Sequence, residues 1–242
     1  MKNVTHTYNN GFKPKTVTLK DNYTFYPLSF IYKFFNFITI FITKLLMIIP
    51  KLLIGFKVIG KENIKNIKKA VFISNHVHIL DAFLIGTTLF PKRLYCTTLK
   101  SNLGFPIISK YFRLCGAVPI PTKLNHKKKF YKETMTTLLH NSILFYPEIS
   151  LNPFCNRIRE FDTGAFTIAN KSNSLIVPII LTFHKPHGIY KLFRKKPLIH
   201  LNILKPYEVI NKIKSKDEIY EIMTTYFLEK SDFFFNTNCS NS

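Results

Sequence analysis

Acidic residues are scarce in this chain. Its 242 residues include 35 Lys and Arg but only 13 Asp and Glu, so the formal net charge is +22. An excess of this size suits an anionic partner, which can be a membrane surface, a phosphorylated substrate or nucleic acid. The lysines are spread along the whole sequence, so many of them are also expected simply as solvated groups on exposed faces. Few carboxylates are left to build a metal site.

Cysteine is rare as well. The four cysteines lie far apart, at positions 96, 115, 155 and 239, and no Cys-x-x-Cys pair occurs. This spacing argues against a zinc site and a disulfide framework, and it predicts free thiols in a reducing compartment. The sequence also lacks a Gly-x-Ser-x-Gly elbow, which argues against a serine nucleophile of the α/β-hydrolase kind. No RNA-binding or helix-turn-helix signature accompanies the basic residues.

No apolar run is long enough to cross a membrane. After Lys33 the longest charge-free run is residues 34–43, whereas a bilayer core needs about 20 residues. Residues 26–56 are nevertheless rich in Phe, Ile and Leu, and on a helical wheel their polar side chains form one narrow stripe: Ser29, Lys33, Asn36, Thr43 and Lys44. We predict an amphipathic helix in the membrane interface, with its lysines at the headgroups and a break at Pro50. A buried core helix and a spanning helix are the alternatives. Residues 1–25 are polar, and no cleavable signal peptide is evident.

The remaining sequence alternates between strand-like and helix-like segments. Strands are expected at 57–60, 70–73, 94–98, 117–120, 142–146, 175–181 and 198–204, the last of them half-exposed. Helices are expected at 81–89, 103–114, 126–141, 164–171 and from a capping box at 215–218 onward. This alternation predicts an α/β fold with a largely parallel or mixed central sheet flanked by helices, preceded by the amphipathic membrane-associated helical segment. We divide the chain into a polar extension (1–25), the membrane-associated region (26–56) and one domain (57–242).

One loop concentrates the residues that can do chemistry. The apolar strand at 70–73 is followed by Ser74 and Asn75, then by His76, with Asp81 five positions later at the start of a helix. A strand that runs into a loop and a helix places the loop at the carboxyl edge of the sheet, where open α/β folds hold their sites. A histidine can take a proton near neutral pH, and a nearby carboxylate fixes its tautomer. The two side chains can meet only if the residues between them turn. The alternatives are a chance pairing and a metal site made by His76, His78 and Asp81.

Four segments in order make the chain resemble the glycerolipid acyltransferases, in particular the lysophosphatidate acyltransferases. They are NHVHILD (75–81), KSNLGFPIISKYFRLCGAVPIPTK (100–123), LFYPEISLNP (144–153) and FDTGAFTIANKSNSLIVPII (161–180). The resemblance covers about residues 60–206. It implies that His76 is the catalytic base and that Asp81 is its partner. It also implies an α/β fold and an acyl thioester as the donor.

The same resemblance assigns substrate-binding residues. Lys100 and Lys123 are expected to meet phosphate or the anionic donor, and Glu148 and Ser150 are expected to shape the acceptor site. Two arginines of the family pattern are missing here: Thr122 stands at the first position, and residues 149–152 (Ile-Ser-Leu-Asn) replace the Gly-Thr-Arg-Ser that normally follows Pro-Glu. We hypothesise that Arg157 and Arg159 supply the guanidinium for phosphate from displaced positions, because arginine can grip phosphate in a bidentate way.

The expected function is that of a membrane-associated acyltransferase on the cytoplasmic face. It would move a fatty acyl group from coenzyme A or acyl carrier protein to a lysophospholipid, most simply 1-acylglycerol-3-phosphate, without a metal or other cofactor. The expected partners are these two substrates, the membrane surface and acyl carrier protein, with no role for nucleic acid. Two alternatives stay open: a metal-dependent hydrolase that uses His76, His78 and Asp81, and a non-enzymatic basic protein that binds membranes or nucleic acid.

Overall fold

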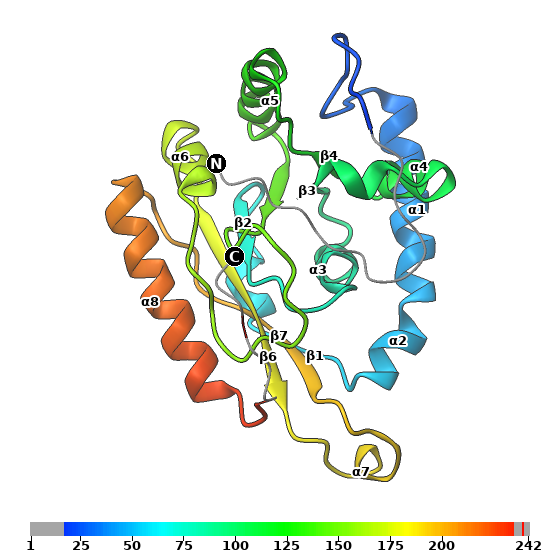
Figure 1. Ribbon diagram of the computed structural model, residues 1–242, viewed down its shortest axis with the longest axis vertical. Helices are drawn as coiled ribbons and strands as arrows, with labels where there is room; N and C mark the ends of the chain where they lie inside the picture. Colours follow the sequence, from blue (N-terminus) through cyan, green and yellow to red (C-terminus); the bar gives the residue numbers. More distant parts are fainter. Residues whose placement is uncertain (1–16, 235–238, 240–242) are drawn as a thin grey trace.

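The computed structural model describes residues 17–234 and residue 239. These residues form a seven-stranded sheet with helices on both faces (Figure 1). The strands are β1 (Lys57–Ile59), β2 (Val71–Ser74), β3 (Leu94–Thr98), β4 (Ala117–Pro119), β5 (Ser142–Phe145), β6 (Ile176–His184) and β7 (Leu198–Ile203). The helices are α1 (Phe30–Leu46), α2 (Ile48–Leu53), α3 (Asp81–Leu89), α4 (Pro106–Leu114), α5 (Leu124–Thr137), α6 (Gly164–Lys171), α7 (Tyr190–Phe193) and α8 (Lys212–Lys230), with 3₁₀ turns η1 (Lys61–Ile64) and η2 (Lys100–Leu103).

The sheet is mixed, as the sequence predicted. Its strand order is β1-β7-β6-β2-β5-β3-β4, and every neighbouring pair is parallel except β6 and β7, which are antiparallel. The central strands β2 and β5 are buried at every position, which is typical of strands covered by helices on both faces. Figure 1 shows α6 and α8 on one side of the sheet and α1, α3 and α4 on the other.

The register of β2 and β5 brings two loops together at the carboxyl edge of the sheet. Ile73 pairs with Phe145, so the chain segments that leave the two strands start side by side. One segment leads through residues 75–80 into α3, whose predicted bounds are confirmed. The other contains residues 147–159 and is called the clasp loop below. The proposed catalytic pair lies on the first of these segments, and the clasp loop packs beside it.

Helices α1 and α2 are joined by a break at Met47, three residues before the proline. Pro50 has no N–H for the carbonyl of Leu46, and its ring crowds that carbonyl, so one continuous helix is disfavoured. The predicted break is therefore confirmed. None of the helices formed by residues 17–234 combines the length and the apolar character needed to cross a membrane.

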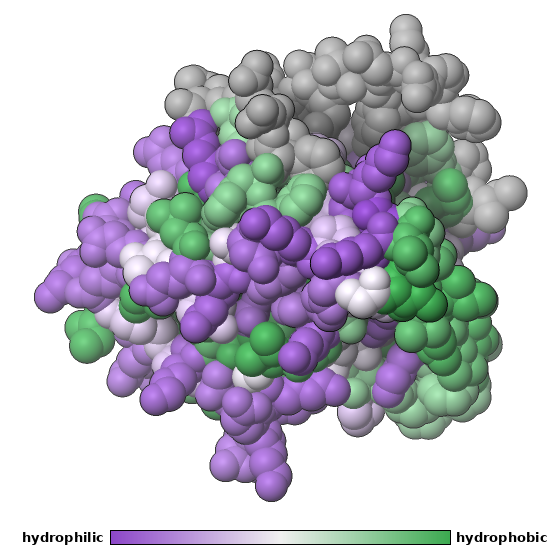
Figure 2. Space-filling view, turned by 90° about the horizontal axis from the view of Figure 1, so that it is seen from below, coloured by the Kyte–Doolittle hydropathy of each residue, from purple (hydrophilic) through white to green (hydrophobic). Residues whose placement is uncertain are grey.

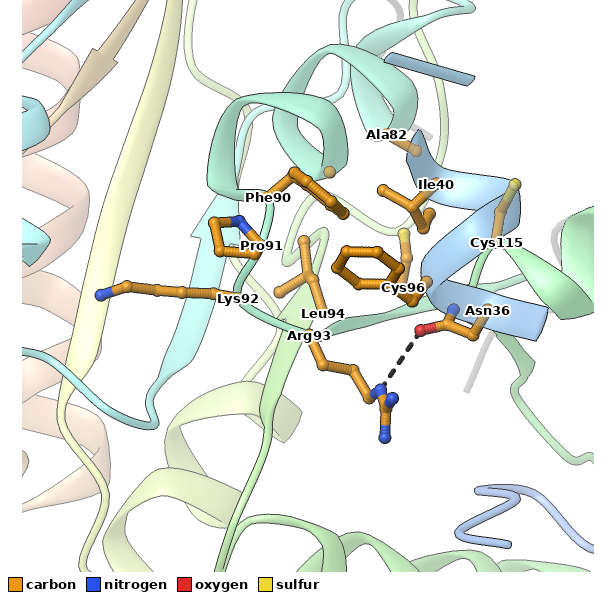
Figure 3. Close-up of a pocket in the computed structure, with 12 residues that line it drawn as sticks. Asn36, Ile40, Ala82, Phe90, Pro91, Lys92, Arg93, Leu94, Cys96 and Cys115 are labelled. Atoms are coloured by element: carbon orange, nitrogen blue, oxygen red, sulfur yellow. Dashed lines mark hydrogen bonds between the residues drawn. The ribbon is translucent and has the colours of Figure 1, made fainter. Parts of the chain in front are cut away.

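The orientation of α1 differs from the prediction. We expected its polar stripe to face headgroups, but Asn36 and Thr43 are buried against the domain. The amide of Asn36 donates to the Leu114 carbonyl and accepts from Arg93 (Figure 3), and the Thr43 hydroxyl bonds the phenol of Tyr111 at 2.7 Å. The apolar side faces outward, where nine large hydrophobic residues are exposed: Phe30, Ile31, Phe34, Phe35, Phe37, Phe41, Ile42, Leu45 and Leu46. Figure 2 shows hydrophobic surface gathered on the side where α1 and α2 lie.

Part of the predicted polar extension belongs to the domain. Phe25 is fully buried, packs edge-on against Phe130 with ring centroids 5.4 Å apart, and donates its backbone N–H to Glu133. Residues 1–16 lie outside the described residues. The apolar side chains near residue 25 thus anchor the described end of this segment to α5.

Three smaller predictions are corrected by the structure. Helix α8 begins at Lys212, because the Asn211 side chain caps it by accepting from the backbone N–H groups of residues 213 and 214, so the capping box at Ser215 is not the start. Strand β7 is almost wholly buried rather than half-exposed. Two of the four cysteines are not free thiols, because Cys155 and Cys239 form a disulfide across 84 residues of sequence.

Candidate active site

His76 and Asp81 meet at the carboxyl end of β2. The chain turns between them, with the N–H of Asp81 donating to the carbonyl of residue 78, and Nδ1 of His76 lies 2.6 Å from Oδ2 of Asp81. The carboxylate is almost completely buried, whereas the imidazole is 23% exposed. When Nδ1–H points to the carboxylate, the lone pair is on Nε2, which can accept a proton from a bound molecule.

Asn75 fixes the start of this loop. Its buried side chain donates to the Leu181 carbonyl and accepts from the Leu181 N–H, at 3.0 and 2.9 Å. The amide thereby pairs with β6 just beyond the last residue of β2. The position of the next residue, His76, is therefore set by the sheet itself.

Tyr146 holds both members of the pair and was not foreseen from the sequence. Its phenol donates to Oδ1 of Asp81 at 2.9 Å, so both carboxylate oxygens have partners. Its ring stacks on the imidazole of His76, with centroids 4.1 Å apart and planes 18° apart. Burial raises the pKa of the Tyr146 phenol well above its usual value of 10.0, so the phenol remains a donor. The available signal was an aromatic residue directly before Pro147-Glu148.

The clasp loop holds the backbone on both sides of His76. The carboxylate of Glu148 accepts the His76 N–H at 3.1 Å, and the Asn152 N–H donates to the His76 carbonyl at 3.0 Å. The Phe154 N–H donates to the carbonyl of Val77 at 2.8 Å. The clasp loop therefore fixes the backbone that carries the imidazole.

Glu148 and Arg159 form a buried ion pair inside this loop. Nη2 of Arg159 lies 2.9 Å from Oε2 of Glu148, the Arg159 backbone N–H donates to Oε1 at 3.0 Å, and Nη1 donates to the Ser150 hydroxyl at 2.8 Å. Burial raises the pKa of the Glu148 carboxyl, and the charge and donors of Arg159 oppose that rise. The three residues thus bind one another. Their role in substrate binding stays a prediction, and it would require this network to open.

The other predicted cations lie on different elements. Half-buried Lys100 starts η2 directly after β3, and exposed Lys123 caps α5 after β4, so both follow strands parallel to β2 at the same edge of the sheet. Neighbouring strands are about 4.8 Å apart, which puts β3 roughly 10 Å and β4 roughly 15 Å from β2. Arg157 instead donates to the carbonyl of Cys239 and lines a cavity with Lys216 of α8. The structure therefore does not pair Arg157 with either lysine.

His78, the remaining member of the alternative metal cluster, has other partners. Nδ1 of His78 accepts the N–H of Leu80 at 3.2 Å, and its ring meets the ring of Phe154 edge-on at 5.7 Å. Burial is the main cause that lowers the pKa of His78. Within the described part of the chain, no group of three or more His, Cys, Asp and Glu side chains could hold a metal ion.

The two cysteines that are not in the disulfide are poor candidates for a covalent nucleophile. Burial raises the pKa of the thiols of Cys96 and Cys115, and it is the thiolate that attacks a thioester. A histidine that acts as a general base would require no such nucleophile.

Ile149 adopts an unusual backbone conformation next to Glu148. Its φ is 68°, in the left-handed region that a β-branched residue rarely enters. The family pattern quoted above has glycine after Pro-Glu, and glycine reaches this region without steric cost. The loop therefore keeps the glycine-like turn although the glycine is gone.

Comparisons with known proteins show the family and a similar fold. A family model described as Acyltransferase matches residues 55–182, just over half of the chain. Among solved structures, the crystal structure of the 1-acyl-sn-glycerophosphate (LPA) acyltransferase PlsC from Thermotoga maritima is similar, with a TM-score of 0.57 and 14% sequence identity, over 85% of this chain and 97% of that one. No curated protein sequence matches significantly. The matched family segment contains His76, Asp81, Tyr146 and Glu148, and the chain belongs to the acyltransferase family.

Proposed function

We propose that this protein transfers a fatty acyl group from an acyl thioester to the free hydroxyl of a lysophospholipid, with 1-acylglycerol-3-phosphate as the first acceptor to test. The observation that carries the proposal is the 2.6 Å contact between Nδ1 of His76 and the buried carboxylate of Asp81, with the imidazole still partly exposed. The Acyltransferase family match supplies the reaction class. The likeness to PlsC supports the fold, and the activity for which that protein is named suggests the acceptor.

The mechanism is general base catalysis. Nε2 of His76 takes the proton of the acceptor hydroxyl while the hydroxyl oxygen attacks the thioester carbonyl carbon. Asp81 keeps Nδ1 protonated and stabilises the imidazolium that forms. When the carbon–sulfur bond breaks, the thiolate leaves and takes the proton back from the imidazolium. The products are the acylated lipid and the free thiol of coenzyme A or acyl carrier protein.

Tyr146 acts in this scheme as a positioning residue. It donates to one oxygen of Asp81, leaving the other oxygen for His76, and it stacks on the imidazole. The imidazole must stay aligned both before and after it gains the proton. A flat partner on one side and a fixed carboxylate at its edge provide that alignment.

We also propose that the enzyme works at a membrane surface, on the cytoplasmic face. Helix α1 buries Asn36 and Thr43 and exposes its apolar side, the reverse of a surface helix in water, and exposed Ile48, Ile49, Leu52 and Leu53 of α2 extend that side. A continuous apolar face of this kind suits the boundary between headgroups and acyl chains. Lysolipid and product would then reside where the active site can reach them.

Lys100 and Lys123 are our candidates for the phosphate of the acceptor or for the anionic donor. Both follow strands whose carboxyl ends share an edge with His76. Arg157 stays a weaker candidate, because its guanidinium bonds the Cys239 carbonyl. An unchanged KM for the acceptor in Arg157→Ala, beside a raised KM in Lys100→Ala, would remove Arg157 from the site.

The test is acyl transfer in bilayers with labelled acyl thioesters and a panel of lysolipids. We expect His76→Ala to lower kcat by about 10² to 10⁴, the usual contribution of a general base. His78→Ala is the matched control, because it removes an imidazole two residues away that lies outside the proposed chemistry, and it should keep most of the activity. Loss of activity in His78→Ala together with loss after exhaustive chelation would instead support the metal-dependent alternative.

A further inference from the structure

The connection between β6 and β7 is far longer than a sheet of this kind needs. Two antiparallel neighbours are commonly joined by two to about five residues, whereas here residues 185–197 project as a hairpin loop that contains α7 (Figure 1). Its tip is apolar and exposed: Ile189 is 68%, Leu192 85% and Phe193 57% accessible. Three large hydrophobic residues at one exposed tip are unusual unless something covers them.

The hairpin loop is fixed to the end of α2. The phenol of Tyr190 donates to the carbonyl of Leu52 at 2.7 Å, and Nη1 of Arg194 donates to the carbonyl of Leu53 at 3.0 Å. Both carbonyls belong to the last turn of α2, where backbone carbonyls are open to partners from outside the helix, and that of Leu52 also accepts from the N–H of Gly55. These bonds hold the apolar tip beside the exposed apolar residues of α2, so the two surfaces adjoin.

The charged residues of the hairpin loop are all basic. Residues 185–197 (KPHGIYKLFRKKP) contain four lysines and one arginine and no acidic residue. Lys and Arg side chains close to an anionic bilayer are attracted to its headgroups. Apolar residues at the tip with cations around them match the two layers of such a surface, acyl chains and phosphate headgroups.

We propose that the β6–β7 hairpin loop is a second membrane-inserting element, whose occupant is an anionic bilayer. Ile189, Leu192 and Phe193 enter the acyl-chain boundary, and the surrounding lysines contact headgroup phosphates. The hairpin and α1–α2 then form one surface drawn from two distant parts of the sequence. This inference rests on the membrane location proposed above, but it is tested by lipid binding and not by acyl transfer.

The base of the hairpin connects this surface to the active site. Nζ of Lys196 lies 5.4 Å from the centre of the Phe154 ring, and Phe154 in turn contacts His78 edge-on. Phe154 also bonds the backbone one residue after His76. If the hairpin lies in the headgroup layer, the loop that carries His76 lies next to the lipid surface. The acceptor hydroxyl is located at that surface.

The chain has no tryptophan, so a single introduced indole reports on one position. We expect Leu192→Trp in the full-length protein to show a blue-shifted emission with vesicles that contain phosphatidylglycerol, and to be quenched by brominated acyl chains in them. Leu124→Trp is the matched control, since Leu124 is a similarly exposed leucine (68%) on α5, and its emission should stay unchanged. Leu52→Trp on α2 reports separately on the membrane location itself.

The outcomes distinguish membrane insertion of the hairpin loop from the membrane location of the protein. An unchanged emission for Leu192→Trp beside a shifted one for Leu52→Trp would overturn the hairpin proposal and leave the membrane location intact. Leu192→Ser/Phe193→Ser, with folding verified by circular dichroism, should weaken binding to the same vesicles by roughly tenfold or more, because two exposed apolar side chains no longer enter the acyl region. A dimer in sedimentation that this double variant dissociates, with unchanged vesicle affinity, would show that a second copy covers the tip and would refute the proposal.

Discussion

Residue 149 offers a test in which the expected sign is opposite to the usual one. At an ordinary position, alanine is more stable than glycine by about 0.4–1 kcal/mol, because glycine loses more backbone freedom on folding. At φ 68° an L-residue with a Cβ costs about 1–2 kcal/mol, and glycine does not incur this cost. The difference predicts that Ile149→Gly is more stable than Ile149→Ala by about 0.5–1 kcal/mol. Both variants remove the half-exposed isoleucine side chain beyond Cβ, so the loss of its contacts nearly cancels in the comparison.

The measurement is the urea midpoint of each variant, followed by circular dichroism in one buffer. Ile149→Asn is a useful third member, because asparagine tolerates the left-handed region better than other residues with a Cβ, and it should fall between the other two. If Ile149→Ala proves as stable as Ile149→Gly, the turn after Glu148 does not hold the left-handed conformation, and the argument about the missing glycine fails.

Three further predictions concern single side chains. Tyr146→Phe removes the phenol that donates to Asp81. A hydrogen bond to a charged group contributes about 1.5–3 kcal/mol, so kcat should fall roughly 10- to 100-fold with KM unchanged in steady-state assays. An unaltered kcat would mean that the phenol is dispensable. Cys239→Ser opens a link across 84 residues, so the free energy of unfolding should drop by about 2–4 kcal/mol without reductant, whereas with dithiothreitol both proteins should unfold alike. Burial, with the neighbouring His184, lowers the pKa of His200 from 6.5 to about 4, so between these values the unfolded chain binds a proton that the folded chain does not. Stability should therefore decline as the pH falls through this range, and His200→Gln should flatten the decline; identical slopes in urea titrations of the two proteins would contradict it.

Local signals predicted the centre of the fold well. The boundary between β2 and α3 was correct because an apolar β-branched run, a Ser-Asn pair and a following apolar segment all indicate the same change of structure. The contact between His76 and Asp81 was expected only if the residues between them turn, and the structure shows that turn. Tyr146 could not be found in this way, because its role depends on the register of β2 with β5, which joins residues more than 60 positions apart.

Two of the failures, at α1 and β7, share a physical cause, which is that a polar pattern does not show what its polar atoms face. The alternating polar residues of β7 suggested solvent, but Asn202 is buried and bonds the Ile180 carbonyl and the phenol of Tyr226. The polar stripe of α1 suggested headgroups, but Asn36 faces the domain. A helical wheel gives the angle between two faces of a helix and leaves open which face meets the protein.

Three backbone amides join the clasp loop to the loop that carries His76. The amide of His76 donates to Glu148, and the amides of Asn152 and Phe154 donate to the carbonyls of residues 76 and 77. Amides that share one opening event lose their protection together. Hydrogen–deuterium exchange at these three positions should consequently report a single rate of loop opening. The amide of His76, the proposed base, should thus report how often the proposed active site opens, and the measurement needs only the unlabelled wild-type protein.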